Sequence, residues 1–355
     1  MTLKSGSVVL ATRFSALGDV AMTVPALYDA CIASPDVQVV MLTRDFMAPL
    51  FLETPPNLTV VGVNLDDYKG PLGMWRLLGE MSATYGVTHY VDLHDVLRTK
   101  MLRSFCRLKG IPTAKINKGR KEKHSLTRKD DKVLLPLTHS IERYRRALAD
   151  IGMCAKEGAF KGYFATTPPA EAIYASIAGP KEPGERWIGI APFAKHEGKI
   201  YPIELMEQVI RALSESHSTR LFLFGGGPYE NKILSEWARK YHATISLAGQ
   251  RHGFPVELAI MSRMDAMLTM DSANMHLAAL TGVPVVSVWG ATHPYCGFSG
   301  WQVPDENNVQ LPLPCRPCSV FGNKPCATAD YKCLRAIRPQ SIVDRIDAVI
   351  AQKKS

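Results

Sequence analysis

Asp271, Ser272 and His276 have the residue types and spacing of a phosphate-binding turn. An apolar run at 266–270 precedes them and predicts a buried strand, and residues 273–281 have the composition of a helix. A second apolar run at 283–289 completes a strand–helix–strand unit, whose crossover we expect to be right-handed. Ligands of such units bind beyond the carboxyl ends of the strands, where the next helix offers free N–H groups to a phosphate.

A structural interpretation of the same residues is also available. Ser272 and His276 lie one helical turn apart, so both side chains can face one ligand. Asp-Ser is nevertheless a common helix cap, and a single histidine in a helix more often packs than binds. Spacing alone leaves both interpretations open.

Asp19 is a second candidate for chemistry. A predicted strand at 7–14 runs into a glycine-containing turn at 15–19, and an amphipathic helix at 20–33 follows. Catalytic groups are commonly placed at such carboxyl ends of strands, although a carboxylate that only caps the helix would occupy the same position.

Lys199 is a third candidate. It lies in a loop at 192–202 that contains Gly198, follows a predicted strand at 187–191 and precedes a helix. An ammonium group in such a loop acts as a point charge that suits a diphosphate. Glu230 follows a glycine turn after another strand, where it can bind ribose hydroxyls or simply cap the next helix.

Three of these stretches resemble motifs of the ADP-heptose:lipopolysaccharide heptosyltransferases, glycosyltransferase family 9. Residues 271–279 and a Gly-x-Thr-x-Pro loop at 290–294 resemble the donor motif D-[ST]-G-x-x-H-x-x-A-A, with Ala273 in place of the glycine. The opening RFSALGDVAMTVPAL resembles R-x-S-x-x-G-D-x-x-x-x-x-P-x-L, and the loop at 192–202 resembles the family's K-[RHx]-[WY]-P donor loop. Pro192-Phe193 departs from the small pair common there, and Ala273 lets the backbone approach a sugar nucleotide less closely than glycine would.

The resemblance implies an activity and a role for each candidate. Asp19 matches the proposed general base of an inverting transfer of heptose from ADP-heptose to a lipopolysaccharide core acceptor of the Kdo-lipid A type. The donor is expected to be a substrate rather than a cofactor, no cofactor is required, and a need for a divalent metal stays an open question. The residues implied to bind the donor are Ala194, Lys199, Glu230, Asp271, Ser272, Ala273 and His276.

The order of strands and helices predicts the fold class. Strands that alternate with helices along all 355 residues predict two doubly wound α/β domains with mostly parallel sheets. The resemblance implies two Rossmann-like domains that face each other across a cleft, the GT-B arrangement. We expect an N-terminal acceptor domain at 1–168, a proline-rich linker at 169–186 and a nucleotide-sugar domain at 187–338. We expect the amphipathic helix at 339–355 to pack back on the N-terminal domain.

Positive charge is concentrated in the first half of the chain. The net charge of the chain is +9, yet residues 98–146 alone contain sixteen Lys and Arg against four Asp and Glu. This block favours an anionic glycolipid acceptor, with a solvated surface as the alternative, and residues 117–132 read as a mobile basic loop. It lacks the aromatic or zinc-finger pattern of nucleic-acid modules, so no nucleic acid is expected. The expected acceptor contacts are Arg98, Lys100, Arg120 and Lys121.

Four cysteines, Cys315, Cys318, Cys326 and Cys333, lie close together in the sequence. We expect reduced thiols without metal, and a tetrahedral zinc site is the alternative. The N-terminus has no apolar signal core, and no apolar run is long enough to span a membrane, so we expect a cytoplasmic protein, free or peripheral to the inner membrane. Alternatives to the implied function are a related glycosyltransferase for another sugar nucleotide and acceptor, or a non-catalytic nucleotide-sugar or nucleic-acid binder.

Overall fold

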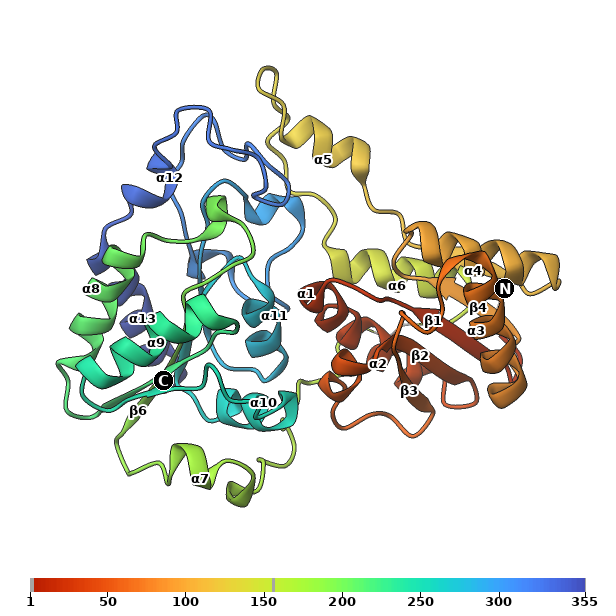
Figure 1. Cartoon of the computed structure of the whole chain (residues 1–355), viewed down its shortest axis with the longest axis horizontal. Coiled ribbons are helices and arrows are strands. Elements are labelled where there is room, and N and C mark those ends of the chain that lie inside the picture. The colour runs from red at the N-terminus through yellow and green to blue at the C-terminus, as the bar shows by residue number, and fades with distance from the viewer. Residues whose placement is uncertain (1–2, 155–156, 355) are drawn as a thin grey trace. The chain divides into compact units, whose positions relative to one another are not determined.

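A computed structural model describes residues 3–154 and 157–354 of the chain. The chain divides into two units, each with its own parallel sheet (Figure 1). Unit 1 comprises Met1–Lys118 and Thr138–Lys161, and unit 2 comprises Gly119–Leu137 and Gly162–Ser355.

The sheet of unit 1 has five parallel strands in the order β3-β2-β1-β4-β5. Apolar runs form these strands because helices cover a parallel sheet on both faces. The strands are β1 (Val8–Thr12), β2 (Gln38–Arg44), β3 (Leu58–Val63), β4 (His89–Asp92) and β5 (Thr113–Lys115). The helices are α1 (Leu17–Ala21), α2 (Thr23–Ala33), 3-10 helix η1 (Asp45–Leu50), α3 (Gly70–Tyr85), α4 (Leu97–Leu108) and α6 (Ser140–Asp150).

The strand order of unit 1 reverses at β1. The chain first proceeds from β1 to β2 and β3 on one side, and then places β4 on the other side of β1. The loops that leave β1 and β4 therefore diverge, and this topological switch point is where ligands bind in open α/β sheets. Both Asp19 and the turn after β4 lie at this edge.

The sheet of unit 2 has six parallel strands in the order β11-β10-β9-β6-β7-β8, and its switch point lies between β6 and β9. The strands are β6 (Arg186–Ala191), β7 (Thr219–Leu223), β8 (Thr244–Ser246), β9 (Ala266–Met270), β10 (Val285–Val288) and β11 (Asn308–Val309). The helices are α5 (Arg120–Leu126), α7 (Ala175–Ala178), α8 (Ile203–Ser214), α9 (Pro228–Lys240), α10 (Phe254–Ser262), α11 (Ala273–Leu280), α12 (Lys332–Arg335) and α13 (Pro339–Lys354). Short 3-10 helices are η2 (Glu171–Ile173), η3 (Glu197–Lys199), η4 (Pro294–Cys296) and η5 (Asp305–Asn307).

The basic stretch at 117–132 was expected to be a loop of the N-terminal domain, and the structure contradicts this expectation. The stretch forms α5, and residues 119–137 belong to unit 2. The Lys132 ammonium donates to the carbonyl oxygens of Cys315 at 2.7 Å and Pro317 at 3.2 Å, and the Lys123 ammonium lies 4.2 Å from the centre of the Phe298 ring. These contacts join segments far apart in the sequence, so local composition could not reveal them.

The prediction for the terminal helix is wrong. The apolar side chains of α13, among them Ile342, Ile346 and Ile350, are buried in the core of unit 2 beside Val209 of α8. The amphipathic pattern showed that one face of this helix is buried, but not which unit covers it. Within the described residues, none of the helices has the length and apolar character needed to cross a membrane.

We predict that Ile346→Ala destabilises unit 2. Ile346 is fully buried, so the truncation should lower the free energy of unfolding by about 2–5 kcal/mol. Thermal unfolding of the full chain, with proteolysis to identify the unit that opens, measures this effect. Exposed Ala351→Ser on the same helix is the control, and a loss of protection confined to unit 1 would contradict the assignment.

Candidate active site

Asp19 lies in the turn that follows β1, and Arg13 holds it there. Arg13 is 5% exposed, its Nη2 lies 2.7 Å from Asp19 Oδ2, and its Nη1 donates to the Leu93 carbonyl oxygen at 2.6 Å. The Asp19 side chain is 33% exposed. One buried guanidinium thus orients the carboxylate and fixes it to the end of β4, while solvent still reaches it.

Tyr144 of α6 completes the surroundings of this ion pair. Its hydroxyl donates to the Asp19 carbonyl oxygen at 3.3 Å, and the Arg13 guanidinium lies 5.5 Å from the centre of its ring. Burial holds the pKa of Tyr144 well above its usual value, so this side chain is a neutral hydrogen-bond donor at physiological pH.

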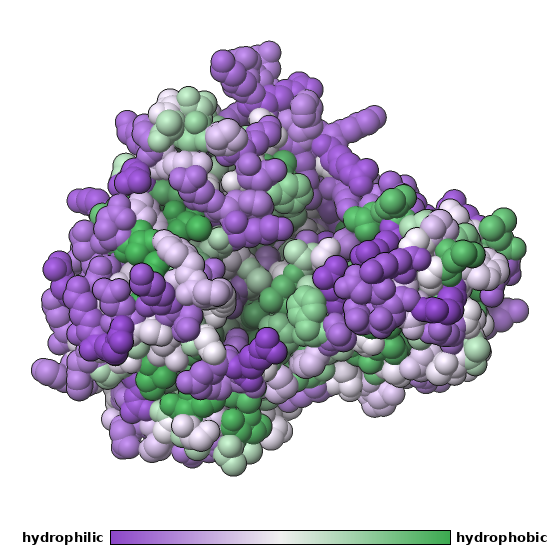
Figure 2. Space-filling model, in the orientation of Figure 1, coloured by the Kyte–Doolittle hydropathy of each residue, from purple (hydrophilic) through white to green (hydrophobic). Residues whose placement is uncertain are grey.

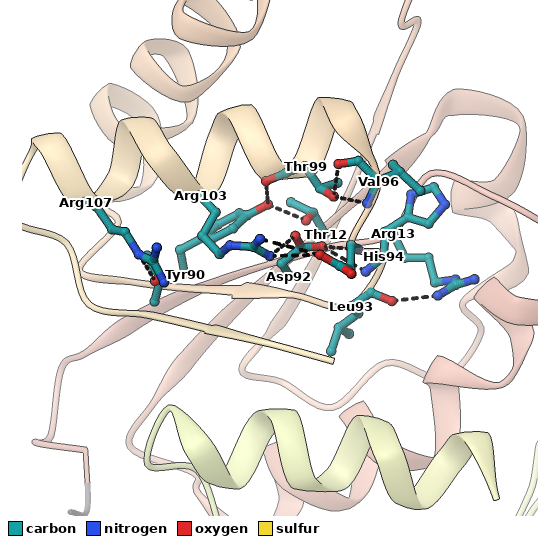
Figure 3. A network of polar contacts seen from close by, with 12 residues as sticks. Thr12, Arg13, Tyr90, Asp92, Leu93, His94, Val96, Thr99, Arg103 and Arg107 are labelled. Atoms are coloured by element: carbon teal, nitrogen blue, oxygen red, sulfur yellow. Dashed lines mark hydrogen bonds and ion pairs between the residues drawn. The ribbon is translucent and has the colours of Figure 1, made fainter. Parts of the chain in front are cut away.

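Asp92 shapes the neighbouring turn after β4 (Figure 3). It is fully buried, and its Oδ1 accepts hydrogen bonds from the N–H groups of His94 at 2.9 Å and Asp95 at 2.7 Å. Arg103 of α4 balances its charge, with Nη1 2.7 Å from Asp92 Oδ2. A buried carboxylate with this many partners fixes the backbone from which His94 projects.

His94 faces the turn that carries Asp19. Its Nδ1 accepts from the Phe14 N–H at 3.4 Å, so the neutral ring carries its proton on Nε2, which lies 3.2 Å from Ser15 Oγ. Burial, and to a lesser degree the nearby charge of Arg13, lower the pKa of His94 to about 3. His94 is therefore a neutral ring at physiological pH, and both its nitrogens are engaged.

Arg13, His94 and Tyr144 were missed in the sequence. A signal for Arg13 and His94 exists, because both follow strands that are neighbours at a switch point, as Asp19 does. Tyr144 gives no such signal, because it lies far along the chain in a helix.

In unit 2, Lys199 and Asp271 form an ion pair. The Lys199 Nζ lies 2.9 Å from Asp271 Oδ2, and the two side chains are 16% and 5% exposed. Asp271 directly follows β9, and Lys199 ends η3 in the loop that follows β6. The structure therefore brings together two of the donor residues expected from the sequence, at the switch point of this sheet.

Glycines allow the loops around this pair to pack tightly. A Cβ at Gly198 would lie 2.9 Å from the Ala291 Cβ, and a Cβ at Gly290 would lie 2.5 Å from the Gly198 carbonyl oxygen. Gly322 has φ of +72°, and a Cβ there would lie 2.5 Å from the Lys199 Cγ. These positions exclude a side chain, so the stem of Lys199 is confined on this side.

Arg316 fixes the loop after β10. It is 3% exposed and donates to the carbonyl oxygens of Gly290 at 2.5 Å and Thr292 at 2.9 Å. Burial of the His293 ring in the same loop lowers its pKa to about 4, and the positive charge of Arg316 is the smaller cause. The loop resembling the family's Gly-x-Thr-x-Pro motif is thus held by a buried guanidinium that sequence reasoning did not identify.

Two buried hydroxyl groups lie in these segments, Ser272 at the start of α11 and Thr292 in the loop after β10. Ser272 occupies the N-cap with extended backbone, and its side chain does not cap the helix. Within the described residues, neither Ser272 Oγ nor Thr292 Oγ1 has a hydrogen-bond partner. Together with the N–H groups of the helix, these hydroxyls are suited to a bound anion.

The other expected donor residues have mixed surroundings. Ala194 is partly buried against the core of unit 2, Ala273 begins α11, and His276 is 6% exposed on that helix. Glu230 Oε2 accepts from the Gly226 N–H at 2.7 Å, so in this structure its carboxylate stabilises the glycine turn before α9.

The four expected acceptor residues do not share one unit. Arg98 is half-buried and Lys100 exposed at the start of α4, whereas Arg120 and Lys121 are exposed at the start of α5 in unit 2. Their assignment to a single acceptor domain at 1–168 is therefore wrong, because the contacts of Lys132 and Lys123 attach that segment to unit 2.

The four clustered cysteines do not form a ligand set in this structure. Cys315 is exposed, Cys333 is buried, and all four are free thiols. Across residues 3–154 and 157–354, no three His, Cys, Asp or Glu side chains are grouped so that they could hold a metal ion.

We predict that His94 makes unit 1 sensitive to acid. The pKa of His94 is about 3 in the folded protein and about 6.5 when unfolded, so the unfolded state takes up a proton that the folded state excludes. The stabilising contribution of neutral His94 is complete above about pH 6.5 and is lost progressively as the pH falls towards 3. As the pH falls through this range, the free energy of unfolding should decrease less steeply in His94→Asn than in the wild type. The slopes of the two proteins should differ by about 1 kcal/mol per pH unit.

Urea unfolding of the two proteins between about pH 7 and 5 measures this difference. The control is His217→Asn, which replaces an exposed histidine of unit 2. Parallel pH profiles for wild type and His94→Asn would show that His94 is not buried as described.

Relatives with known names align with nearly the whole chain. The chain is 22% identical over 337 residues to lipooligosaccharide heptosyltransferase 2 of Campylobacter jejuni, covering 93% of this chain and 94% of the relative. It is 23% identical over 373 residues to lipopolysaccharide heptosyltransferase 1 of Pseudomonas aeruginosa, covering 96% and 98%.

Solved structures share the fold. The glycosyl transferase family 9 protein of Veillonella parvula superposes with a TM-score of 0.74 at 17% identity over 99% of each chain. The E. coli ADP-heptose lps heptosyltransferase II gives a TM-score of 0.69 at 16% identity, over 98% of this chain and all of the other. The expected fold class, two Rossmann-like α/β domains of the GT-B type, is confirmed.

A family model identifies the group to which the chain belongs. The model described as glycosyltransferase family 9 (heptosyltransferase) matches residues 100–325, which is more than half of the chain and includes the Lys199 loop and the Asp271 turn. With the Arg13–Asp19 and Lys199–Asp271 pairs at the switch points of their sheets, this match shows that the chain belongs to glycosyltransferase family 9, the heptosyltransferases.

Proposed function

We propose that this protein is an inverting heptosyltransferase that transfers heptose from ADP-heptose to a lipopolysaccharide core acceptor of the Kdo-lipid A type. Family membership and the names of the relatives support the substrate classes. The observation that carries the chemistry is Asp19, a partly exposed carboxylate at the switch point of unit 1 that a buried arginine orients.

In the proposed reaction, Asp19 is the general base. The acceptor hydroxyl attacks the anomeric carbon of the donor sugar and gives its proton to the Asp19 carboxylate. The bond between that carbon and the diphosphate oxygen breaks in the same displacement, the nucleoside diphosphate leaves with the electron pair, and the configuration inverts. His94 is less suited to this role, because its unprotonated nitrogen, Nδ1, already accepts the Phe14 N–H and the ring is buried.

Unit 2 binds the donor in this proposal. The Lys199 ammonium and the N–H groups at the start of α11 supply positive charge to the diphosphate, and the Ser272 and Thr292 hydroxyls can bond its oxygens. These groups stabilise charge that grows on the leaving group, so they contribute to the transition state as well as to binding. We therefore propose that no cofactor is needed.

Basic residues on both units serve the anionic acceptor in this proposal. Arg98 and Lys100 lie at the start of α4, next to the edge that carries Asp19 in unit 1, and Arg120 and Lys121 lie on α5 of unit 2. A phosphorylated glycolipid matches their charge, and we place the enzyme at the cytoplasmic surface of the inner membrane, without a nucleic-acid partner.

A coupled assay for nucleoside diphosphate release tests the function. We expect ADP release from ADP-heptose that depends on a Kdo-lipid A acceptor, together with a raised melting temperature in ADP-heptose alone. Turnover only with a UDP-, GDP- or CDP-sugar would assign another donor. Donor binding without release under any of these conditions would show a non-catalytic binder.

We predict that Asp19→Asn lowers kcat by roughly two to four orders of magnitude, the usual contribution of a positioned base. Donor affinity, measured by calorimetry, should change little, because Asp19 lies in unit 1 and the proposed donor site in unit 2. Stability should fall by about 1–3 kcal/mol, because buried Arg13 loses its charged partner.

Activity is therefore measured well below the melting temperature of this variant. Exposed Asp36→Asn, which removes the same charge elsewhere in unit 1, is the control. Near-normal turnover in Asp19→Asn would leave its carboxylate with only the role of orienting Arg13.

We predict that Lys199→Ala weakens donor binding roughly tenfold or more, because the diphosphate loses a charge-assisted contact worth about 1.5–3 kcal/mol. Isothermal titration with ADP and with ADP-heptose measures this change. Lys195→Ala removes an exposed lysine from the same loop and should bind as the wild type does. If the two variants bind equally well, Lys199 is not part of the donor site.

A further inference from the structure

Helices α3 and α4 of unit 1 carry exposed apolar side chains that belong neither to the hydrophobic core nor to the proposed catalytic site. Leu72 is 85% exposed, Leu108 78%, Leu97 74% and Trp75 43%. In Figure 2, apolar surface is visible over the end of unit 1 where Figure 1 places these two helices. We call these four residues, with Lys100, Arg107 and Lys109, the α3–α4 patch.

The leucines of α4 lie on one outward stripe. Leu97 and Leu108 are eleven residues apart, which is close to three helical turns, so both project from the same side at a separation of about 16 Å. Met101 and Ser104 lie between them on this stripe and are partly buried and exposed, respectively. The two leucines therefore project from the solvent side of the helix near its two ends, with exposed Ser104 between them.

Trp75 joins α3 to this surface. Its ring packs edge-on against Phe105 of α4 with centroids 5.2 Å apart, and the Lys109 ammonium lies 4.9 Å from the ring centre. Leu72 precedes Trp75 by one helical turn, on the same side of α3. Apolar side chains, a tryptophan and a lysine thus lie together at the end of α4.

The charge around the patch has one dominant sign. Residues 96–118 contain seven Lys and Arg and no Asp or Glu. Arg103 is paired with Asp92 and Asp95, so it adds little to the surface charge. On the α3 side, Glu80 pairs with Arg76 at 3.5 Å. The surface on the α4 side of the patch is therefore positively charged, whereas Asp66 and Asp67 precede α3 on the side of Leu72.

We propose that the α3–α4 patch docks unit 1 onto the surface of an anionic lipid bilayer. Leucines can enter the boundary between headgroups and acyl chains, tryptophan favours that interface, and each Lys or Arg near an anionic surface adds attraction. A second copy of the chain is a poorer occupant, because the basic α4 helices of the two copies, which contain no Asp or Glu, would repel each other face to face.

The inference rests on the proposed function only in that the acceptor is a lipid. Because α4 begins directly after the turn that holds His94, docking through this helix would bring the edge of unit 1 that carries Asp19 towards the membrane surface. A glycolipid would then reach Asp19 without leaving the bilayer.

Sedimentation with lipid vesicles tests the proposal on the full chain, with neither donor nor acceptor present. Wild type should bind vesicles of phosphatidylcholine with phosphatidylglycerol, and bind vesicles of phosphatidylcholine alone much more weakly. High salt should weaken the binding to the mixed vesicles. Leu72→Ser with Leu108→Ser should lower the partition coefficient at least tenfold, because leucine burial is lost.

Two matched controls distinguish lipid binding by this patch from non-specific adsorption of the protein to vesicles. Ile32→Ser removes an exposed apolar residue from α2 of the same unit and should bind as wild type does. Arg107→Gln with Lys109→Gln should reduce binding to the anionic vesicles several-fold, whereas Arg211→Gln with Lys232→Gln on unit 2 should not.

Wild-type binding by the leucine variant, or equal losses in it and in Ile32→Ser, would overturn the proposal. So would a change of oligomeric state in the leucine variant without a change in vesicle binding, which would indicate self-association. If the leucine variant fails to fold, the Arg107 and Lys109 variant decides the question alone. Vesicle binding without glycosyl transfer would refute the proposed function and leave this inference standing.

Discussion

The buried guanidinium of Arg13 makes the interactions on which the candidate site of unit 1 depends. It pairs with Asp19, donates to the Leu93 carbonyl oxygen and lies over Tyr144, so one side chain joins the ends of β1 and β4 to α6. A buried charge is costly unless it is paired, so this arginine constrains its neighbours to fixed positions. The constraint leaves Asp19 both oriented and accessible, which is the combination that a general base needs.

Unit 2 shows the same physical arrangement with the charges exchanged. There a mostly buried carboxylate, Asp271, follows a strand at the switch point and holds the cationic Lys199. Arg316 and the close glycine contacts then fix the surrounding loops. In each unit the sheet topology creates a gap between diverging loops, and one ion pair at that gap sets the position of the group with a chemical role.

The residues that support the turn beside Asp19 are less exposed to solvent than Asp19 itself. Asp92 and His94 are buried and Arg103 is partly buried, and their hydrogen bonds determine the shape of the turn beside Asp19. Other side chains of α4, among them Leu97 and Leu108, are exposed on its outer side. A single helix therefore contributes Arg103 to the site on its inner side and a basic, apolar surface on its outer side.

The sequence by itself determined the two α/β domains and the turns with Asp19, Lys199 and Asp271, because apolar runs, glycines and caps act between neighbours in the chain. Only the tertiary structure decided that Arg13 and His94 surround Asp19, that residues 119–137 join unit 2, and that α13 packs there. Arg13 and Leu93 are 80 residues apart, and Lys132 and Cys315 are 183 residues apart. Such contacts depend on which surfaces meet after the sheets have formed, and periodicity along the chain does not contain that information.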